Sequence, residues 1–225
     1  SPITNKRTDE YGGSLANRVR FAIEVAECVR AAWPAEKPLF MRLSVDDGAG
    51  WDPASSVALA RELNARGVDF FFSNSGTDFT PILDALARYD GTPSFRLRTV
   101  VAPHENTAIS MAHGYALLSG KPQAVMAHVN VGTANMGLGI INAARARVPM
   151  LVLAGKTPWY ESDVDGCRTN FVQWGQDTFD QGAMFREFTK WDHELKGARN
   201  LATVVDRALA IARSEPAGPV YLTLP

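Results

Sequence analysis

The chain has 225 residues, enough for one α/β domain or two smaller ones with a substantial core. Its net charge is -1, with acidic and basic residues interspersed, so no basic face favours binding to nucleic acid or to an anionic membrane. No apolar run reaches membrane-spanning length and no charged-then-apolar leader begins the chain. We therefore expect a soluble cytoplasmic protein.

The first 68 residues alternate between helical and strand patterns. Apolar residues recur at helical spacing after Ser14, which can cap a helix, and Pro34 ends the pattern. An apolar strand is predicted at 38–44, and a second helix begins near Pro53 and is closed by Gly67. This α-β-α-β order with short connections indicates a parallel sheet.

From residue 69 a longer series of the same kind begins. The predicted strands lie near 68–73, 99–102, 123–129, 149–154 and 219–224, and the predicted helices near 82–89, 104–119, 140–144 and 201–211. The stretch 159–194 is rich in aromatic residues but poorly periodic. Nearly pure aliphatic strands alternating with helices predict an α/β fold built on a doubly wound parallel sheet.

The stretch 100–108 joins an apolar strand end to a helix through Pro103 and places Glu105 in the first helical turn. Backbone donors and the positive helix end favour a charged carboxylate there, whereas burial would favour the neutral form. Such a group suits proton sharing with a bound heterocycle. Taken alone, however, Glu105 is better explained as a charge that caps its helix.

His128 ends the strand 123–129, and the glycine-rich residues 132–135 are predicted to form a turn that opens the next helix. No Gly-Lys-Ser/Thr follows, so these glycines favour close packing rather than a nucleotide loop. His104 and His113 lack a cysteine or carboxylate at ligand spacing. We therefore expect no metal site made by this chain alone.

Three stretches near the start carry a family resemblance: 2–14, 17–18 and 40–44. They are similar to the Old Yellow Enzyme family of flavin-dependent ene-reductases, and the similarity runs to about residue 69. The resemblance implies a TIM barrel in which Arg42 contacts the FMN ring at a strand end. Because two βα units cannot close an eight-stranded barrel, we expect Arg42 to pair with Asp46 or Asp47 rather than with FMN.

A second resemblance is carried by short motifs at predicted strand ends and helix starts. They are Gly76-Thr77-Asp78, Pro103-His104-Glu105, Gly114-Tyr115-Ala116, His128 with Gly132-Thr133-Ala134-Asn135, Asn142-Ala143, Pro149, Gly155 and Gly218-Pro219-Val220. In this order and spacing, residues 69–225 resemble the N-terminal pyrimidine-binding domain of the thiamine-diphosphate-dependent decarboxylases and acetolactate synthases.

The second resemblance implies roles for several residues. Glu105 would contact N1′ of the aminopyrimidine and promote the imino tautomer, whose 4′-nitrogen removes the thiazolium C2 proton. His128 would lie near the substrate, as in benzoylformate-decarboxylase-like members, although a strand-end histidine bonded to backbone is an equally good explanation. The cofactor-binding positions that the family implies are Gly76, Pro103, Glu105, Gly132, Thr133 and Asn135.

In this family a separate C-terminal domain binds the diphosphate and Mg²⁺, and the active site lies between two subunits. We therefore expect a homo-oligomer or a partner subunit with the diphosphate domain, a small 2-oxo acid as substrate, and no activity from this chain alone. The alternatives are a remnant of a flavin ene-reductase and a non-catalytic hybrid, since 67–72 fits both resemblances. The first strand of a doubly wound sheet is usually interior, so residues 1–66 are expected at a sheet edge or loosely packed.

Overall fold

The computed structural model describes residues 7–12, 14–32, 53–89, 92–162, 167–168 and 170–225. The chain forms two compact units, Ser1–Val45 and Asp46–Pro225, which are described separately. In the first unit, α1 spans Leu15–Ala32. The predicted cap is confirmed, because the Ser14 Oγ accepts a hydrogen bond from the backbone N–H of Asn17 at 3.2 Å. The predicted strand 38–44 and Arg42 lie outside the described residues.

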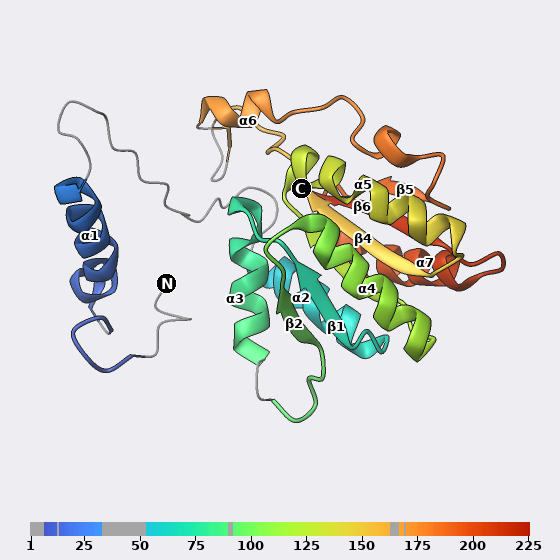
Figure 1. Cartoon of the computed structure of the whole chain (residues 1–225), viewed down its shortest axis with the longest axis horizontal. Helices are drawn as coiled ribbons and strands as arrows, with labels where there is room; N and C mark the ends of the chain where they lie inside the picture. The colour runs from blue at the N-terminus through green and yellow to red at the C-terminus, as the bar shows by residue number, and fades with distance from the viewer. Residues whose placement is uncertain (1–6, 13, 33–52, 90–91, 163–166, 169) are drawn as a thin grey trace. The chain divides into compact units, whose positions relative to one another are not determined.

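The second unit is built on a six-stranded sheet in which every neighbouring pair is parallel (Figure 1). The strands are β1 (Phe70–Ser73), β2 (Arg98–Val101), β3 (Gln123–Ala127), β4 (Met150–Gly155), β5 (Asp192–Glu194) and β6 (Pro219–Leu224). Their spatial order is β2-β1-β3-β4-β6-β5. The five strands predicted from residue 68 onward are confirmed. The edge strand β5 was not predicted, because three residues are too few to show an alternation.

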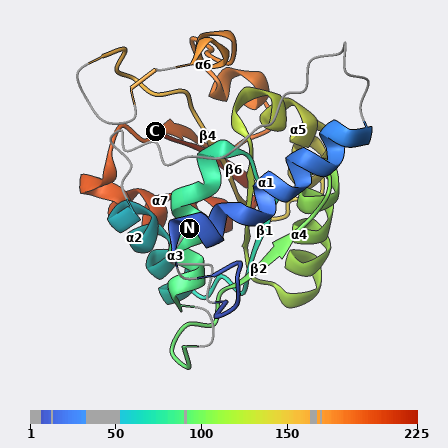
Figure 2. The same ribbon diagram turned by 90° about the vertical axis from the view of Figure 1, so that its left-hand side faces the viewer.

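Helices cover both faces of the sheet, as Figure 2 shows with the sheet between two groups of helices. The main helices of this unit are α2 (Pro53–Ala65), α3 (Thr80–Tyr89), α4 (Glu105–Ser119), α5 (Val129–Arg145) and α7 (Leu201–Arg213), with a short α6 at Phe171–Gly175. Phe71 points into the core shared with α2, α3 and α7, whereas its neighbour Phe72 points into the core shared with α4 and α5. This alternation confirms the predicted doubly wound α/β fold.

Helix α2 belongs to the core of the second unit. Its Leu59 and Leu63 are each 1% exposed and pack in the same cluster as Phe71, Leu86 of α3 and Leu209 of α7. The expectation that residues 1–66 pack loosely or at a sheet edge is therefore wrong for α2. The apolar stripe of this helix complements the face that α3 and α7 leave open, and burial of that stripe fixes the helix there.

The predicted turn at 132–135 is also wrong, since these residues lie inside α5. The helix begins at Val129, directly after His128, and the backbone N–H of Gly132 donates to the carbonyl of His128 at 2.7 Å. Glycines usually indicate a turn in a sequence. Here Gly132 serves instead to let the helix approach its neighbours closely. None of the helices in the described part of the chain combines the length and apolar composition needed to cross a bilayer.

The role of α2 can be tested by truncating one buried leucine. We expect Leu59→Ala to lower the free energy of unfolding by about 2–5 kcal/mol, because it leaves a cavity in a core that cannot fully collapse. Leu118→Ala on α4 is the matched control, since Leu118 is 93% exposed and its truncation should cost no more than about 0.5 kcal/mol. Urea denaturation followed by circular dichroism measures both; equal, small effects would show that α2 is not part of the core.

Candidate functional site

Most of the predicted site residues gather at the carboxyl end of the parallel sheet. After β1 the chain passes through α3 to one face of the sheet, and after the neighbouring β3 it passes through α5 to the other face. In doubly wound sheets such a switch point is where ligands bind. Gly76, Glu105 and His128 follow the ends of β1, β2 and β3 respectively, so the fold brings three distant motifs to the same end of the sheet.

Glu105 occupies the first turn of α4, as the sequence predicts. Its side chain is 12% exposed, and Oε2 accepts a hydrogen bond from the Nδ2 of Asn135 at 3.1 Å. The preceding residue, His104, caps the helix, because its Nδ1 accepts the backbone N–H of Asn106 at 3.1 Å. The carboxylate is thus set at a helix N-terminus and oriented by an amide from α5.

Gly132 allows α5 to approach this carboxylate. A Cβ added at Gly132 would lie 2.9 Å from the Cβ of Ala127 and 3.4 Å from the Oε1 of Glu105. Contacts below 3.0 Å are not tolerated without movement. The first turn of α5 therefore lies directly against both the end of β3 and the glutamate, and it brings Gly132, Asn135 and Glu105 together.

His128 forms a second polar group with Asp78, which lies in the short 3₁₀ helix Thr77–Phe79 after β1. Its Nδ1 lies 2.6 Å from the Oδ1 of Asp78, and the two side chains are 14% and 13% exposed. The Nε2 of His128 lies 3.3 Å from the Nε2 of Gln176. Gly76 packs against this imidazole so closely that a Cβ there would come within 2.2 Å of it. His128 is therefore bonded to side chains rather than to backbone.

Thr133 points away from Glu105 and His128. Its Oγ1 is fully buried, donates to the carbonyl of Val129 at 2.8 Å and lies 2.7 Å from the hydroxyl of Tyr221. The Nε2 of Gln181 donates to that hydroxyl at 2.9 Å and to the carbonyl of Gly155 at 3.0 Å. Because the Thr133 proton is already given to Val129, Tyr221 donates to Thr133 and accepts from Gln181. The Thr133 side chain serves this buried chain of hydrogen bonds.

Pro103, the remaining predicted cofactor contact, is exposed in the turn between β2 and α4. It directs the chain away from the edge strand β2 and lies two residues before Glu105. In the described part of the chain, no three His, Cys, Asp or Glu side chains gather in a way that could hold a metal ion.

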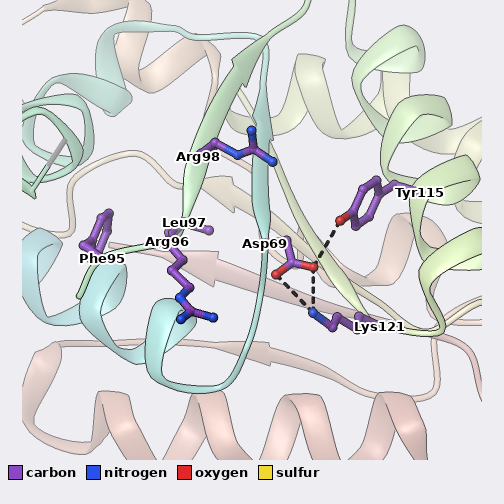
Figure 3. Close-up of a pocket in the computed structure, with 7 residues that line it drawn as sticks. All are labelled: Asp69, Phe95, Arg96, Leu97, Arg98, Tyr115 and Lys121. Atoms are coloured by element: carbon purple, nitrogen blue, oxygen red, sulfur yellow. Dashed lines mark hydrogen bonds and ion pairs between the residues drawn. The ribbon is translucent and has the colours of Figure 1, made fainter. Parts of the chain in front are cut away.

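A separate cavity of about 580 Å³ lies at the opposite, amino end of the sheet (Figure 3). It is lined by Asp69, Phe95, Arg96, Leu97, Arg98, Tyr115 and Lys121. Asp69, which directly precedes β1, accepts hydrogen bonds from the hydroxyl of Tyr115 at 3.2 Å and from the Nζ of Lys121 at 3.0 Å. These bonds tie the start of β1 to α4 and to the loop beyond it, a structural role that involves none of the predicted site residues.

Comparison with known proteins identifies the family of the second unit. Residues 55–184 match the family described as "Thiamine pyrophosphate enzyme, N-terminal TPP binding domain", and this match covers more than half of the chain. The chain belongs to the thiamine pyrophosphate enzyme family. Glu105, His128, Gly132 and Asn135 all lie inside the matched range, as does α2 from residue 55 onward.

Two relatives of this domain are named as a decarboxylase and a synthase. The chain is 30% identical over 164 residues to benzoylformate decarboxylase of Pseudomonas aeruginosa, covering 72% of this chain and 28% of that protein. It is 30% identical over 166 residues to the mitochondrial acetolactate synthase catalytic subunit of Saccharomyces cerevisiae, covering 72% of this chain and 22% of that protein. The chain thus spans about a quarter of the length of these relatives.

The start of the chain has a different similarity. Residues 1–74 match the NADH:flavin oxidoreductase / NADH oxidase family. NADPH dehydrogenase of Clostridium acetobutylicum is 52% identical over 60 residues, which are 25% of this chain and 18% of that protein. The two family matches overlap at 55–74, a range that contains most of α2 and all of β1. Both resemblances found in the sequence are confirmed.

Sequence reasoning missed the partners of the site residues in this thiamine pyrophosphate enzyme domain. Asp78 stood only as part of a motif, and Gln176 and Tyr221 were not singled out. The sequence did carry one signal for Asp78, which follows the end of a strand two residues after Gly76, while His128 ends a neighbouring strand. The carboxyl ends of adjacent parallel strands lie at the same edge of a sheet, so these two side chains could be expected to meet. Gln176 and Gln181 come from the poorly periodic stretch 159–194, where the sequence carries no such signal.

The buried network of the thiamine pyrophosphate enzyme domain predicts a pH dependence. Burial raises the pKa of Tyr221 to about 12 from an ordinary value of 10.0, although its hydrogen bonds with Thr133 and Gln181 act in the opposite direction. A group whose pKa is higher in the folded state than in the unfolded state contributes stability at any pH below its unfolded-state pKa. This stability is lost as the pH rises through the folded-state pKa.

We expect Tyr221→Phe to destabilise the protein by about 1–3 kcal/mol near neutral pH, because Gln181 and Thr133 lose a buried partner. The stability difference from the unmodified chain should narrow as the pH rises from about 10 to about 12. Tyr160→Phe, at a residue that is 59% exposed, is the control and should change little. The free energies of unfolding of the two proteins, measured with denaturant across this pH range, test the prediction. A stability difference that does not change with pH would contradict the role of Tyr221.

Proposed function

We propose that the second unit is the pyrimidine half-site for thiamine diphosphate, with Glu105 as the residue that contacts N1′ of the aminopyrimidine. One observation carries this proposal: a carboxylate of low exposure is held at the N-terminus of α4, with one oxygen bound to Asn135 and the other beside Gly132. The family match supports it independently.

The arrangement suits proton sharing with a ring nitrogen. Asn135 occupies Oε2, and among the described residues no hydrogen bond to Oε1 is formed, so Oε1 is left for a ligand. A carboxylate in a poorly hydrated position interacts more strongly with a nitrogen heterocycle than one in water would. Gly132 keeps the first turn of α5 close to this carboxylate, because a side chain there would collide with Ala127.

The residues present fit the pyrimidine portion of the cofactor. When bound, thiamine diphosphate supplies a carbanion at thiazolium C2 for attack on a carbonyl. Glu105 would hold and exchange the proton at N1′, and His128 would face the substrate. Gly76 would contact the cofactor through its backbone, because it has no side chain to place between ligand and His128.

We propose a 2-oxo-acid decarboxylase or an acetolactate-synthase-like carboligase as the class of reaction. The names of the two 30%-identical relatives support these classes. The chain spans about a quarter of their length, so we propose that these 225 residues do not turn over a 2-oxo acid by themselves. The diphosphate and Mg²⁺ would be held by a domain on another subunit, either of a homo-oligomer or of a different partner.

The flavin similarity supports a weaker second candidate. It covers 18% of the length of the dehydrogenase named above, and two βα units are too few to close an eight-stranded barrel. We therefore propose that residues 1–74 are the remnant of a flavin ene-reductase sequence that does not bind FMN. A yellow purified protein with bound FMN would favour the flavin reading instead.

Calorimetric titration with thiamine and with thiamine diphosphate tests the main proposal. We expect the two to bind with similar affinity, because the chain contributes only the pyrimidine contact, and Glu105→Gln to weaken both by about 10- to 100-fold, the loss expected for a hydrogen bond to a charged group. Glu187→Gln is the matched control, since Glu187 is an exposed carboxylate lining a separate depression.

An unchanged affinity for thiamine in Glu105→Gln would refute the role of Glu105. Release of CO₂ from pyruvate or benzoylformate by the unmodified chain with thiamine diphosphate and Mg²⁺ would refute the proposed dependence on another domain.

A further inference from the structure

Asp78 and His128 form a short contact that is largely buried. The Nδ1 of His128 and the Oδ1 of Asp78 are 2.6 Å apart, and both side chains are largely shielded from water. The other carboxylate oxygen, Oδ2, lies 3.4 Å from the backbone N–H of Val129, the first residue of α5. Asp78 thus bridges the imidazole and the helix N-terminus that directly follows it.

This position determines which nitrogen of His128 carries the proton. A carboxylate at a helix N-terminus is stabilised in its charged form, and a charged carboxylate can only accept hydrogen bonds. The proton of the short contact therefore resides on Nδ1. In the neutral ring Nε2 is then bare, which agrees with its second contact, because the amide Nε2 of Gln176 can only donate to it.

The surrounding backbone leaves this pair little freedom to move. Gly76 lies against the imidazole, and a Cβ at Gly155 would come within 2.1 Å of the Oδ2 of Asp78. Val129 has a φ of 38°, a strained conformation for a β-branched residue, and its carbonyl is held by Thr133. Such strain persists only where the surroundings over-determine it, as they do at this helix start.

We propose that Asp78 is a positioning residue that fixes the Nδ1–H tautomer of His128 and so presents Nε2 as a hydrogen-bond acceptor toward the ligand. This inference rests on the proposed function, in which His128 faces the substrate. The amide of Gln176 then occupies the place of a ligand's hydrogen-bond donor.

The chain contains its own reference for this assignment. His104 uses Nδ1 to accept the backbone N–H of Asn106, so its neutral ring must carry the proton on Nε2. His104 and His128 are therefore expected to be opposite tautomers in the same molecule. The difference is a property of the free protein and needs no ligand.

A long-range ¹H–¹⁵N correlation spectrum of the ¹⁵N-labelled 225-residue chain, recorded at alkaline pH, tests the proposal. The spectrum distinguishes protonated from bare ring nitrogens, and His128→Gln and His104→Gln assign the signals. We expect Nδ1–H for His128 and Nε2–H for His104. Asp78→Ala should convert His128 mainly to Nε2–H, while Asp78→Asn, which retains an acceptor oxygen, should preserve Nδ1–H at least in part.

Gln176→Ala is the matched control, because it removes the other partner of His128 and should leave the tautomer unchanged. A bare Nδ1 in the unmodified chain, or a tautomer that survives Asp78→Ala, would overturn the proposal, and the spectrum of the unmodified chain decides even if Asp78→Ala does not fold. Failure of thiamine to bind would refute the proposed function without changing this spectrum, so the two failures are distinguishable.

Discussion

The close approach of the first turn of α5 to the end of β3 is the constraint on which the candidate site depends. It is possible only because residue 132 lacks a side chain, and it places the helix beside the carboxylate of Glu105. The second turn of the same helix supplies Asn135 to orient that carboxylate, and the helix begins directly after His128. Glu105 is thus held by two helices that leave the same end of a rigid parallel sheet, an arrangement that favours a fixed geometry over a flexible loop site.

The buried polar chain beneath this turn gives it further support. Gln181, Tyr221 and Thr133 connect the irregular segment after β4, the strand β6 and the start of α5. These buried hydrogen bonds favour one arrangement, because each member that moved would leave another without a partner. The segment 159–194 therefore contributes to the site in two ways. Gln181 belongs to the buried chain of hydrogen bonds, and Gln176 contacts His128.

The overlap between the two family similarities has a structural meaning. The shared range 55–74 contains a helix and a strand that pack within the second unit, with Leu59 and Leu63 in the core beside Phe71. A βα segment that suits a barrel also suits a doubly wound sheet, since both need an amphipathic helix followed by an apolar parallel strand. We infer that residues 55–74 can connect the two kinds of sequence because this helix and strand suit either fold.

Periodicity and strand-end motifs were sufficient to predict the sheet, its two covered faces and the place of Glu105. They could not predict β5, whose three residues are too short for a pattern, nor that Gly132 lies within a helix, since a glycine that permits close packing looks like one that forms a turn. The Asp78–His128 contact joins residues 50 positions apart. Thr133 illustrates a further limit. Its motif could be recognised in the sequence, but the direction of its side chain could not be predicted, because it depends on Tyr221 in the last strand.

The most direct test of the central claim is to locate thiamine on the protein. Amide spectra of the ¹⁵N-labelled chain titrated with thiamine should show their largest changes at Glu105, Gly132 and Asn135, with smaller changes at Gly76 and His128. Changes centred instead on Asp69, Arg98 and Tyr115 would place the ligand in the cavity at the amino end of the sheet and contradict the account.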